Sequence, residues 1–202
     1  MPDRGEGSPE LRESLTRILN EIAERAGRRE RPTAEMARRR QRLFMEKLAA
    51  PRRYVGAFRG ESGLERTGVK IGAQHGAPPA RVAEELRVFE EVLQAVVARL
   101  DQDIPIGKEL NSDELAAVID LCAWAHSEWV RIHPFANGNG RTARLWANFI
   151  ALRYGLPPFV RLRPRPNEGY EAAGAKAMEG DWKPSATVFR RMLKRFLDEF
   201  RE

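Results

Sequence analysis

Helical spacing of apolar residues runs through most of this 202-residue chain and restricts its fold more than any other feature. Between residues 82 and 100, apolar side chains recur three or four positions apart, which places them on one face of a helix. The segment 112–131 is apolar on more than one side, so we expect that helix to be central. The full set of expected helices is 11–27, 32–49, 82–100, 112–131, 140–152, 167–179 and 184–200. The pattern predicts a mainly α-helical protein.

The segment 51–79 interrupts the helical pattern, because nine glycines and prolines fall within it. Two short candidate strands lie between them, at Tyr54–Phe58 and Thr67–Ile71, and the second ends in alternating apolar and polar residues. We therefore expect a small β-hairpin or flap. We divide the chain into an N-terminal helical, arginine-rich extension over 1–53 and a main domain over 54–202.

The bulk composition excludes several classes of protein. The single cysteine, Cys122, allows neither a disulfide framework nor a thiolate metal cluster, and its apolar surroundings predict a small buried side chain. No stretch reaches the ~18 apolar residues of a membrane span. The N-terminus lacks the apolar core of a secretory signal peptide. We predict no membrane association and a cytoplasmic location, with delivery from there into another cell left open.

The formal charge of +6 is unevenly placed, since residues 25–53 hold ten arginines and one lysine. Within this stretch, Arg38, Arg39, Arg40 and Arg42 are expected on the exposed face of one helix. A solvated helix face is the simpler interpretation. A contact with nucleic acid or with an acidic partner is the alternative, although no groove-reading motif accompanies it.

The segment 133–144 has the properties of a phosphate-binding loop. Pro134 cannot continue the preceding helix, so the chain turns there. Gly138, Asn139 and Gly140 then let backbone N–H groups converge, and a new helix starts at about Gly140 with unpaired N–H groups and the positive end of its dipole. A turn of this composition also occurs in proteins without catalysis, so a purely structural turn stays an alternative at this point.

Three side chains add chemistry to this loop. Arg141 and Arg144 are three residues apart and therefore neighbours on one helix face. Arginine presents a rigid fork of donors that suits phosphate oxygens. His133 stands at the edge of the loop and can act as a general base, because the ordinary histidine pKa lies near physiological pH. The arrangement favours phosphoryl-type chemistry, in which positioning and charge neutralisation dominate.

The sequence from His133 to Arg144 resembles the signature of the Fic/Doc (Fido) family, His-Pro-Phe-x-(Asp/Glu)-Gly-Asn-Gly-Arg-x-x-Arg. Eleven of its twelve positions agree or are free. The glycine-rich segment 57–79, the helix 112–131 and Gly169-Tyr170 with the helix after them also resemble the family, so the likeness spans about 54–197. It implies a Fic-type helical domain with a small β-hairpin flap, and the activity of a protein nucleotidyltransferase.

The resemblance assigns roles to the matching positions. His133 would deprotonate a Ser, Thr or Tyr hydroxyl of a target protein, which would then attack the α-phosphorus of ATP and take up AMP. Gly138, Asn139 and Gly140 would line the anion site, and Arg141 and Arg144 would hold the near and far parts of the phosphate chain. Phe135 would be a buried anchor, and Tyr170 would lie near the base of the nucleotide. The flap, made of Thr67, Gly68, Val69, Lys70 and Ile71, would hold the target by strand addition.

One position departs from the signature, because Asn137 stands where the family has an acid that binds a divalent metal. Asparagine offers an oxygen without charge, and hard cations prefer charged oxygen ligands. Three interpretations stay open: weaker Mg²⁺ binding at Asn137, partial replacement of the metal by the basic pocket, or a change to another donor with altered or lost activity. We favour reduced but real Mg²⁺-dependent transfer.

A second departure concerns regulation. Many relatives carry an inhibitory helix of the form (Ser/Thr)-x-x-x-Glu-(Gly/Asn), whose glutamate pairs with the second arginine of the signature. Glu-Gly occurs here at Glu6, Glu168 and Glu179, but the residues four positions earlier are Pro2, Pro164 and Ala175. We therefore predict that Arg144 is not blocked by such a helix of this chain, and that a separate antitoxin-like inhibitor or another control acts instead.

Several other residues have simpler interpretations. His126 lies seven positions before His133, and we favour a buried, hydrogen-bonded histidine over a second catalytic or metal-binding one. Asn148, one turn after Arg144, is expected to tie its helix to a neighbour. The rival to the enzyme is a basic helical protein that binds nucleic acid or a partner through 25–53 and keeps a vestigial nucleotide site. Salt-sensitive binding that ignores His133 would favour this rival.

Overall fold

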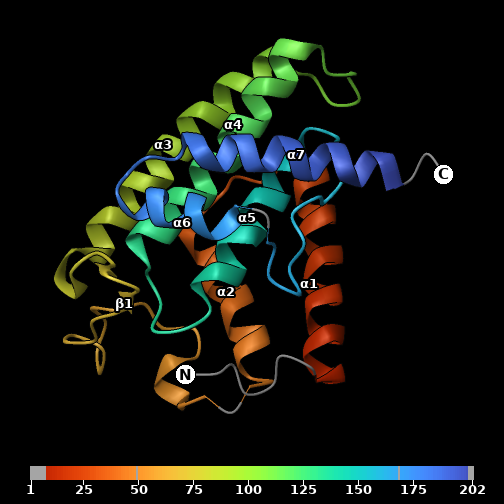
Figure 1. Ribbon diagram of the computed structural model, residues 1–202. Coiled ribbons are helices and arrows are strands. Elements are labelled where there is room, and N and C mark those ends of the chain that lie inside the picture. The colour runs from red at the N-terminus through yellow and green to blue at the C-terminus, as the bar shows by residue number, and fades with distance from the viewer. Residues whose placement is uncertain (1–7, 49, 168, 200–202) are drawn as a thin grey trace.

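The computed structural model describes residues 8–48, 50–167 and 169–199, and these fold into packed helices with one small sheet at their edge (Figure 1). The expectation of a mainly α-helical fold with a small hairpin is confirmed. The helices are α1 (Pro9–Gly27), α2 (Ala34–Met45), α3 (Val82–Asp103), α4 (Ser112–Ile132), α5 (Asn139–Arg153), α6 (Tyr170–Met178) and α7 (Lys183–Glu199). The strands are β1 (Lys70–Ile71) and β2 (Gln74–His75), and short 3-10 turns lie at Arg52–Tyr54 and Pro79–Arg81. Some residues named in the sequence analysis lie outside the described part of the chain. They include the Glu-Gly positions Glu6 and Glu168 and the expected helix ends at Ala49 and Phe200.

Helices α4 and α5 form the centre of the molecule. All residues from 141 to 151 are buried, because α1, α2 and α4 pack around α5. Helix α4 is in turn covered by α3, α6 and α7, as its apolar residues on more than one side predicted. Trp129 of α4 and Trp146 of α5 meet in the core with ring centroids 5.7 Å apart. The two helices that flank the candidate loop are therefore also the best-fixed elements of the fold.

The start of α4 shows how local sequence fixes a helix end. The side chain of Asn111 accepts hydrogen bonds from the N–H groups of Asp113 and Glu114, at 3.0 and 2.9 Å. The carboxylate of Glu114 accepts one in return from the N–H of Asn111, at 3.1 Å. This reciprocal capping box makes Asn111 the N-cap. Ser112, whose side chain is also a common cap, is the first residue of the helix.

The flap differs from its prediction in its pairing. Tyr54–Phe58 is not a strand: it contains the end of a 3-10 turn and a single bridge between Phe58 and Phe135. The expected strand Thr67–Ile71 is reduced to Lys70–Ile71, which pairs with Gln74–His75. The physical reason lies partly at Gly56, which has a φ of +66° and whose N–H donates to the Gln41 side chain at 2.6 Å. A backbone group held by a side chain cannot join a strand ladder.

The arginine face of α2 is less exposed than predicted. Arg40 is buried, donates to the Met36 carbonyl at 2.6 Å and lies 3.5 Å from Glu21 of α1. Arg38 is half-buried, stacks over the Phe58 ring at 4.2 Å and pairs with Glu61. Both are covered because α2 lies between α1 and the glycine-rich segment. Arg39 and Arg42 are exposed, so the expectation of an exposed four-arginine face is wrong for two of the four.

Candidate active site

The chain leaves α4 through a strained histidine. His133 ends the helix in the left-handed region, with φ 53° and ψ 56°, and its N–H still donates to the Trp129 carbonyl at 3.0 Å. A non-glycine residue in this conformation is uncommon and persists only where its surroundings enforce it. Such strain is often found at functional positions.

The imidazole of His133 is prepared to accept a proton. Its Nδ1 lies 2.9 Å from the Val130 carbonyl oxygen, which can only accept, so Nδ1 carries the hydrogen and Nε2 keeps its lone pair. Burial lowers the pKa of His133, the bond to the Val130 carbonyl opposes this, and the charge of Arg59 lowers the pKa further. The side chain is therefore neutral at physiological pH, as a general base must be.

Arg59 positions the backbone of this histidine and was not found by sequence reasoning. Its side chain is 1% exposed. Its guanidinium donates to the carbonyls of His133 and Ile132, at 2.7 and 2.9 Å, and to that of Thr67 in the flap at 3.3 Å. Burial lowers the pKa of Arg59. One side chain thus joins the end of α4 to the predicted target-binding segment, at a position with no recognisable sequence signal.

The flap lies directly against His133. A Cβ added to Gly76 would be 2.7 Å from the Cβ of His133, so only glycine allows the flap this close. The N–H of Ala77 donates to the Ile132 carbonyl at 3.1 Å, and the N–H of Gly76 donates to that of Val69 at 3.3 Å. The structure therefore places the predicted flap residues beside the predicted base. Lys70 is exposed on β1, which pairs with β2.

The loop after His133 is braced from inside by Asn139. The Asn139 side chain accepts from the N–H of Phe135 at 2.9 Å and donates to the Phe135 carbonyl at 2.8 Å. Phe135 is fully buried against Phe58, with ring centroids 4.8 Å apart. The anchor role expected for Phe135 fits this burial. Asn139 serves the loop through its side chain, so it can offer a phosphate only its backbone N–H.

Gly138 and Gln41 hold the other half of the loop. Gly138 has a φ of +92°, and a Cβ there would lie 2.9 Å from the Phe44 ring, so both its conformation and its space require glycine. Gln41, fully buried on α2, donates to the carbonyl of Asn137 at 3.1 Å and to that of Tyr54 at 2.9 Å. Gln41 is a second loop-holding residue that sequence reasoning missed, because its partners are distant in sequence.

The first turn of α5 has the properties of an anion site. Its N-cap is Gly138, which has no side chain to satisfy the N–H groups, and no acidic residue lies in the first turn. The guanidinium of Arg141 stacks over the Phe44 ring at 5.3 Å, and the side chain is 4% exposed. Thr142, hydrogen-bonded to Trp129 Nε1 at 2.8 Å, fixes this turn to α4. Positive charge and the positive end of the helix dipole therefore gather at the loop.

Arg144 points to a different neighbour from Arg141, although they are three residues apart. It donates to the Leu162 carbonyl at 3.1 Å and to the hydroxyl of Tyr170 at 3.4 Å. Arginine cannot accept, so the Tyr170 hydroxyl accepts from Arg144, and its own hydrogen is left for a bond to Nε2 of His126, 2.6 Å away. Tyr170 is thus brought to the second arginine of the loop, and His126 is buried and hydrogen-bonded as favoured from sequence.

The donor set does not fit a resident divalent metal. Asn137 is exposed and brings one neutral amide oxygen. Within residues 8–48, 50–167 and 169–199, there is no group of three or more histidine, cysteine, aspartate or glutamate side chains that could hold a metal ion. A hard cation here would depend on ligands from another molecule, such as the oxygens of a bound polyphosphate.

The sequence model of the Fic/DOC family matches residues 32–151, more than half of the chain. The protein therefore belongs to the Fic/DOC family. Two relatives are each called protein adenylyltransferase Fic. The one from Nematostella vectensis is 37% identical over 87 residues, covering 43% of this chain and 20% of the relative, and the one from Drosophila yakuba is 35% identical over 91 residues, covering 44% and 18%. The matches thus cover about a fifth of these relatives.

Two solved structures share the fold. A Fic-domain-containing signaling protein from Bacteroides thetaiotaomicron has a TM-score of 0.60, with 92% of this chain and 68% of that one covered. Fic-1 from C. elegans has a TM-score of 0.62, with 95% and 51% covered. Both are 23% identical to this chain, so they support the fold and not the chemistry. Both likenesses extend through most of this chain.

No helix in the described part of the chain combines the length and the apolar composition that crossing a bilayer requires. The boundary that we placed after residue 53 stays a prediction. The family match begins at residue 32, and α1 and α2 share the main hydrophobic core.

Proposed function

We propose that this protein transfers AMP from ATP to a hydroxyl side chain of a target protein. The observation that carries the proposal is the neutral, left-handed His133, which is held against the flap by Arg59 and stands a short loop before the glycine-capped N-terminus of α5. The family supplies the class of reaction, and the names of two relatives supply the nucleotide. A cytoplasmic location, where ATP and target proteins are available, is part of the same proposal.

The transfer uses the geometry of His133 as follows. Nε2 accepts the proton of the target hydroxyl, while Nδ1 keeps its bond to the Val130 carbonyl and so stabilises the imidazolium. The hydroxyl oxygen forms a bond to the α-phosphorus, and the bond from that phosphorus to the pyrophosphate oxygen breaks. Pyrophosphate leaves, and the target keeps the AMP. Backbone N–H groups of 138–140 and the charges of Arg141 and Arg144 stabilise the phosphate oxygens.

The flap presents the target by adding a strand. β1 is two residues long and exposes Lys70, so the target segment extends a sheet that has few other pairings. Because Arg59 binds both Thr67 and the backbone of His133, the register of the target is tied to the position of the base. Tyr170 and Arg144 then form the wall of the site on its nucleotide side.

The proposal includes regulation from outside this chain. Glu179, one of the three Glu-Gly positions, pairs with Lys176 at 2.8 Å, whereas Arg144 bonds Leu162 and Tyr170. We keep a separate antitoxin-like inhibitor as a proposal. Deleting 1–30 is not a clean test of it, because that deletion removes α1, whose Leu11, Leu15, Ile18 and Ile22 belong to the core.

The rival function, binding of nucleic acid through 25–53, has weaker support. Arg38 and Arg40 are engaged inside the protein, so the helix face at 38–42 keeps only Arg39 and Arg42 exposed. The other exposed arginines of 25–53 are scattered along the chain, at Arg28, Arg31, Arg52 and Arg53. The rival predicts nucleic-acid affinity that falls steeply with salt, weakens on Arg39→Gln with Arg42→Gln, and is unchanged by His133→Ala.

The deciding experiment is label transfer. The protein is incubated with Mg²⁺, cell lysate and ATP labelled at the α-phosphate, beside the same reaction with ATP labelled at the γ-phosphate. We expect covalent label from the α-position only, on the protein itself or on a lysate band, and its loss in His133→Ala. Label from the γ-position would indicate phosphate transfer instead. Label that persists in His133→Ala would refute the role of this base.

A further inference from the structure

The β-hairpin of the flap has one covered face and one exposed face. Val69 and Ile71 are half-buried, whereas Lys70 between them is exposed, as the side-chain period of two in a strand requires. The N–H of Gly76 donates to the Val69 carbonyl at 3.3 Å, and a Cβ built on Gly76 would lie 2.7 Å from the Cβ of His133. The covered face therefore lies toward the proposed base, and the face of Lys70 lies away from it.

The exposed face of the hairpin is positively charged. Lys70 lies directly opposite His75, which is exposed on β2. Arg66 is exposed in the turn before β1, and Gly68, between the two cations, has open space around it. Within residues 8–48, 50–167 and 169–199, neither Arg66 nor Lys70 forms an ion pair or a side-chain hydrogen bond. Both charges can therefore pair with a group on another molecule.

The acidic residues near the flap lie outside the strand that the target is proposed to join. Glu61 pairs with Arg38 of α2, and the carboxylate of Glu65 accepts a backbone N–H of its own turn at 3.0 Å. Helix α6, which packs against β2, has Glu171 in its first turn. The segment 66–71 itself contains two cations and no acid. The edge formed by β1 is therefore the basic side of the flap.

We propose that the flap selects a target segment with an acidic residue directly before and directly after the modified hydroxyl residue. A strand added beside β1 shares its alternation, so a hydroxyl that reaches His133 lies on the covered face, with Val69. The two residues that flank the hydroxyl residue then lie on the exposed face, beside Lys70 and Gly68. Cross-strand neighbours there are about 5 Å apart, and the long side chain of Arg66 extends past Gly68, which has none.

The preference depends on register and not only on charge. An acid two positions from the hydroxyl residue would lie on the covered face, against Val69 and Ile71. There the carboxylate would lose water without gaining a partner, which is unfavourable. The inference rests on the proposed function, because it names the class of target that the same site accepts, an acidic peptide segment.

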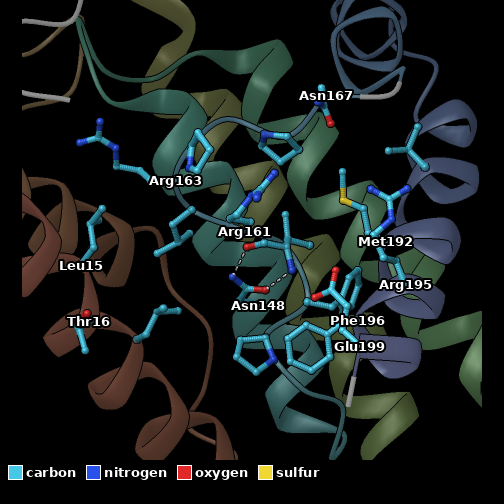
Figure 2. Close-up of a pocket in the computed structure, with 18 of the residues that line it drawn as sticks. Leu15, Thr16, Asn148, Arg161, Arg163, Asn167, Met192, Arg195, Phe196 and Glu199 are labelled. Atoms are coloured by element: carbon cyan, nitrogen blue, oxygen red, sulfur yellow. Dashed lines mark hydrogen bonds between the residues drawn. The ribbon is translucent and has the colours of Figure 1, made fainter. Parts of the chain in front are cut away.

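Attraction of acids to any basic surface has to be separated from recognition by the flap. Arginines also line a cleft of about 790 Å³, whose walls come from α1, α5, the segment 158–167 and α7, and Figure 2 shows Arg161 within it. Asn148 of α5 fixes this segment through two hydrogen bonds with Val160, at 2.8 and 3.0 Å (Figure 2), which confirms the expected tie to a neighbour. The flap is not part of this lining, so the cleft and α1 offer positions for a control.

The test compares two peptides of identical composition, with blocked ends, for binding to the full chain in the absence of nucleotide. In the first peptide, glutamates directly flank a central threonine, and glutamines stand two positions away on each side. In the second peptide, the glutamates and glutamines are exchanged. We expect calorimetry to show about fivefold tighter binding of the first peptide, because each exposed charge pair contributes modestly. Added salt should reduce the preference.

The flap variant is Arg66→Gln with Lys70→Gln, and the matched control is Arg12→Gln with Arg17→Gln on α1. All four residues are exposed, so the two variants differ in where the charge is removed and not in how buried it was. We expect the flap variant to bind the two peptides equally and the control to keep the preference. Hydrogen exchange should show protection of 66–76 by the first peptide.

Three outcomes would overturn the proposal: no binding of either peptide, equal binding of both by the unchanged protein, or loss of the preference in the control variant. Label transfer from α-labelled ATP to the same peptides then tests the proposed function separately. Transfer without a preference between the peptides would refute this inference alone. Preferential binding without any transfer, to peptide or to lysate, would refute the proposed function and leave the acidic recognition by the flap in place.

Discussion

His126 provides a test of the buried network behind the second arginine. Its Nε2 lies 2.6 Å from the Tyr170 hydroxyl, which accepts from Arg144 and has its own hydrogen to offer to a neutral imidazole. The ring is 2% exposed and packs edge-on against Phe189 with centroids 5.3 Å apart. Burial, and then the charge of Arg144, lower the pKa of His126 to about 3. Protonation is thus unfavourable in the folded state.

The sign and size of the effect follow from linkage. Between the ordinary pKa of 6.5 and the folded value of about 3, the unfolded chain binds a proton that the folded chain does not. Acidification therefore stabilises the unfolded state, so the free energy of unfolding falls as pH falls below 6.5. At pH 5 the loss from this residue is about 2 kcal/mol, at about 1.4 kcal/mol per pH unit. Above pH 7 the contribution is nearly constant.

The experiment compares the unchanged protein with His126→Gln by urea unfolding at pH 7.5 and pH 5. Glutamine can place its amide oxygen where Nε2 accepts from Tyr170, and it does not titrate. We expect the variant to be the less stable protein at pH 7.5 and to lose about 2 kcal/mol less on acidification. His133 and the carboxylates titrate in both proteins, so they cancel in the comparison.

The refuting outcome is a difference between the two proteins that does not change with pH. That result would mean that His126 is solvated, or that an acidic group pairs with it. A difference that grows at low pH in the opposite direction would mean that His126 is charged in the folded state, and the direction of the bonds from Arg144 to His126 would then be wrong.

Three further substitutions test the loop. Arg59→Met leaves the three carbonyls that Arg59 binds without their donor, so we expect a loss of about 2–4 kcal/mol in urea unfolding and reduced label transfer; unchanged stability would contradict its bracing role. Gly138→Ala places a side chain at a left-handed φ and against the Phe44 ring, so we expect it to lower the free energy of unfolding by about 2 kcal/mol or more. The comparison is Gly174→Ala in α6, where the space around the residue is open, and we expect that change to raise the free energy of unfolding by about 0.5–1 kcal/mol. Asn137→Asp should lower the Mg²⁺ concentration needed for half-maximal label transfer, and an unchanged requirement would show that this position does not govern metal use.

The helices could be predicted because their signal is local. Periodic apolar residues in α3 and α4 indicate the face that a packed helix buries. The Pro-Phe and Gly-Asn-Gly sequences after His133 indicate a turn, because few residues allow the backbone to adopt it. Gly138 and Arg141 were therefore singled out from local sequence and Phe135 from the family resemblance, and the structure places them in the loop after α4 and in the first turn of α5.

The flap was mispredicted because its structure is not set by its own strand propensity. The residues around Gly56 are held by Gln41 from α2, and the segment at Phe58 is held by one bridge to Phe135 and by Arg59. None of these contacts has a sequence period. A side chain that binds a distant carbonyl has the same appearance in sequence as one that faces solvent, which is why Arg59 and the burial of Arg40 were missed.

Gln41, Arg59 and Asn139 show how one loop can be strained and still well defined. They come from α2, the glycine-rich segment and the loop itself, and each binds backbone groups of 132–139 or of the adjoining turn. Backbone carbonyls so held cannot rotate toward solvent, so His133 keeps its left-handed conformation without a glycine. The conformation of the base and the shape of the loop before α5 are therefore two results of one bonding arrangement, in which α2 takes part.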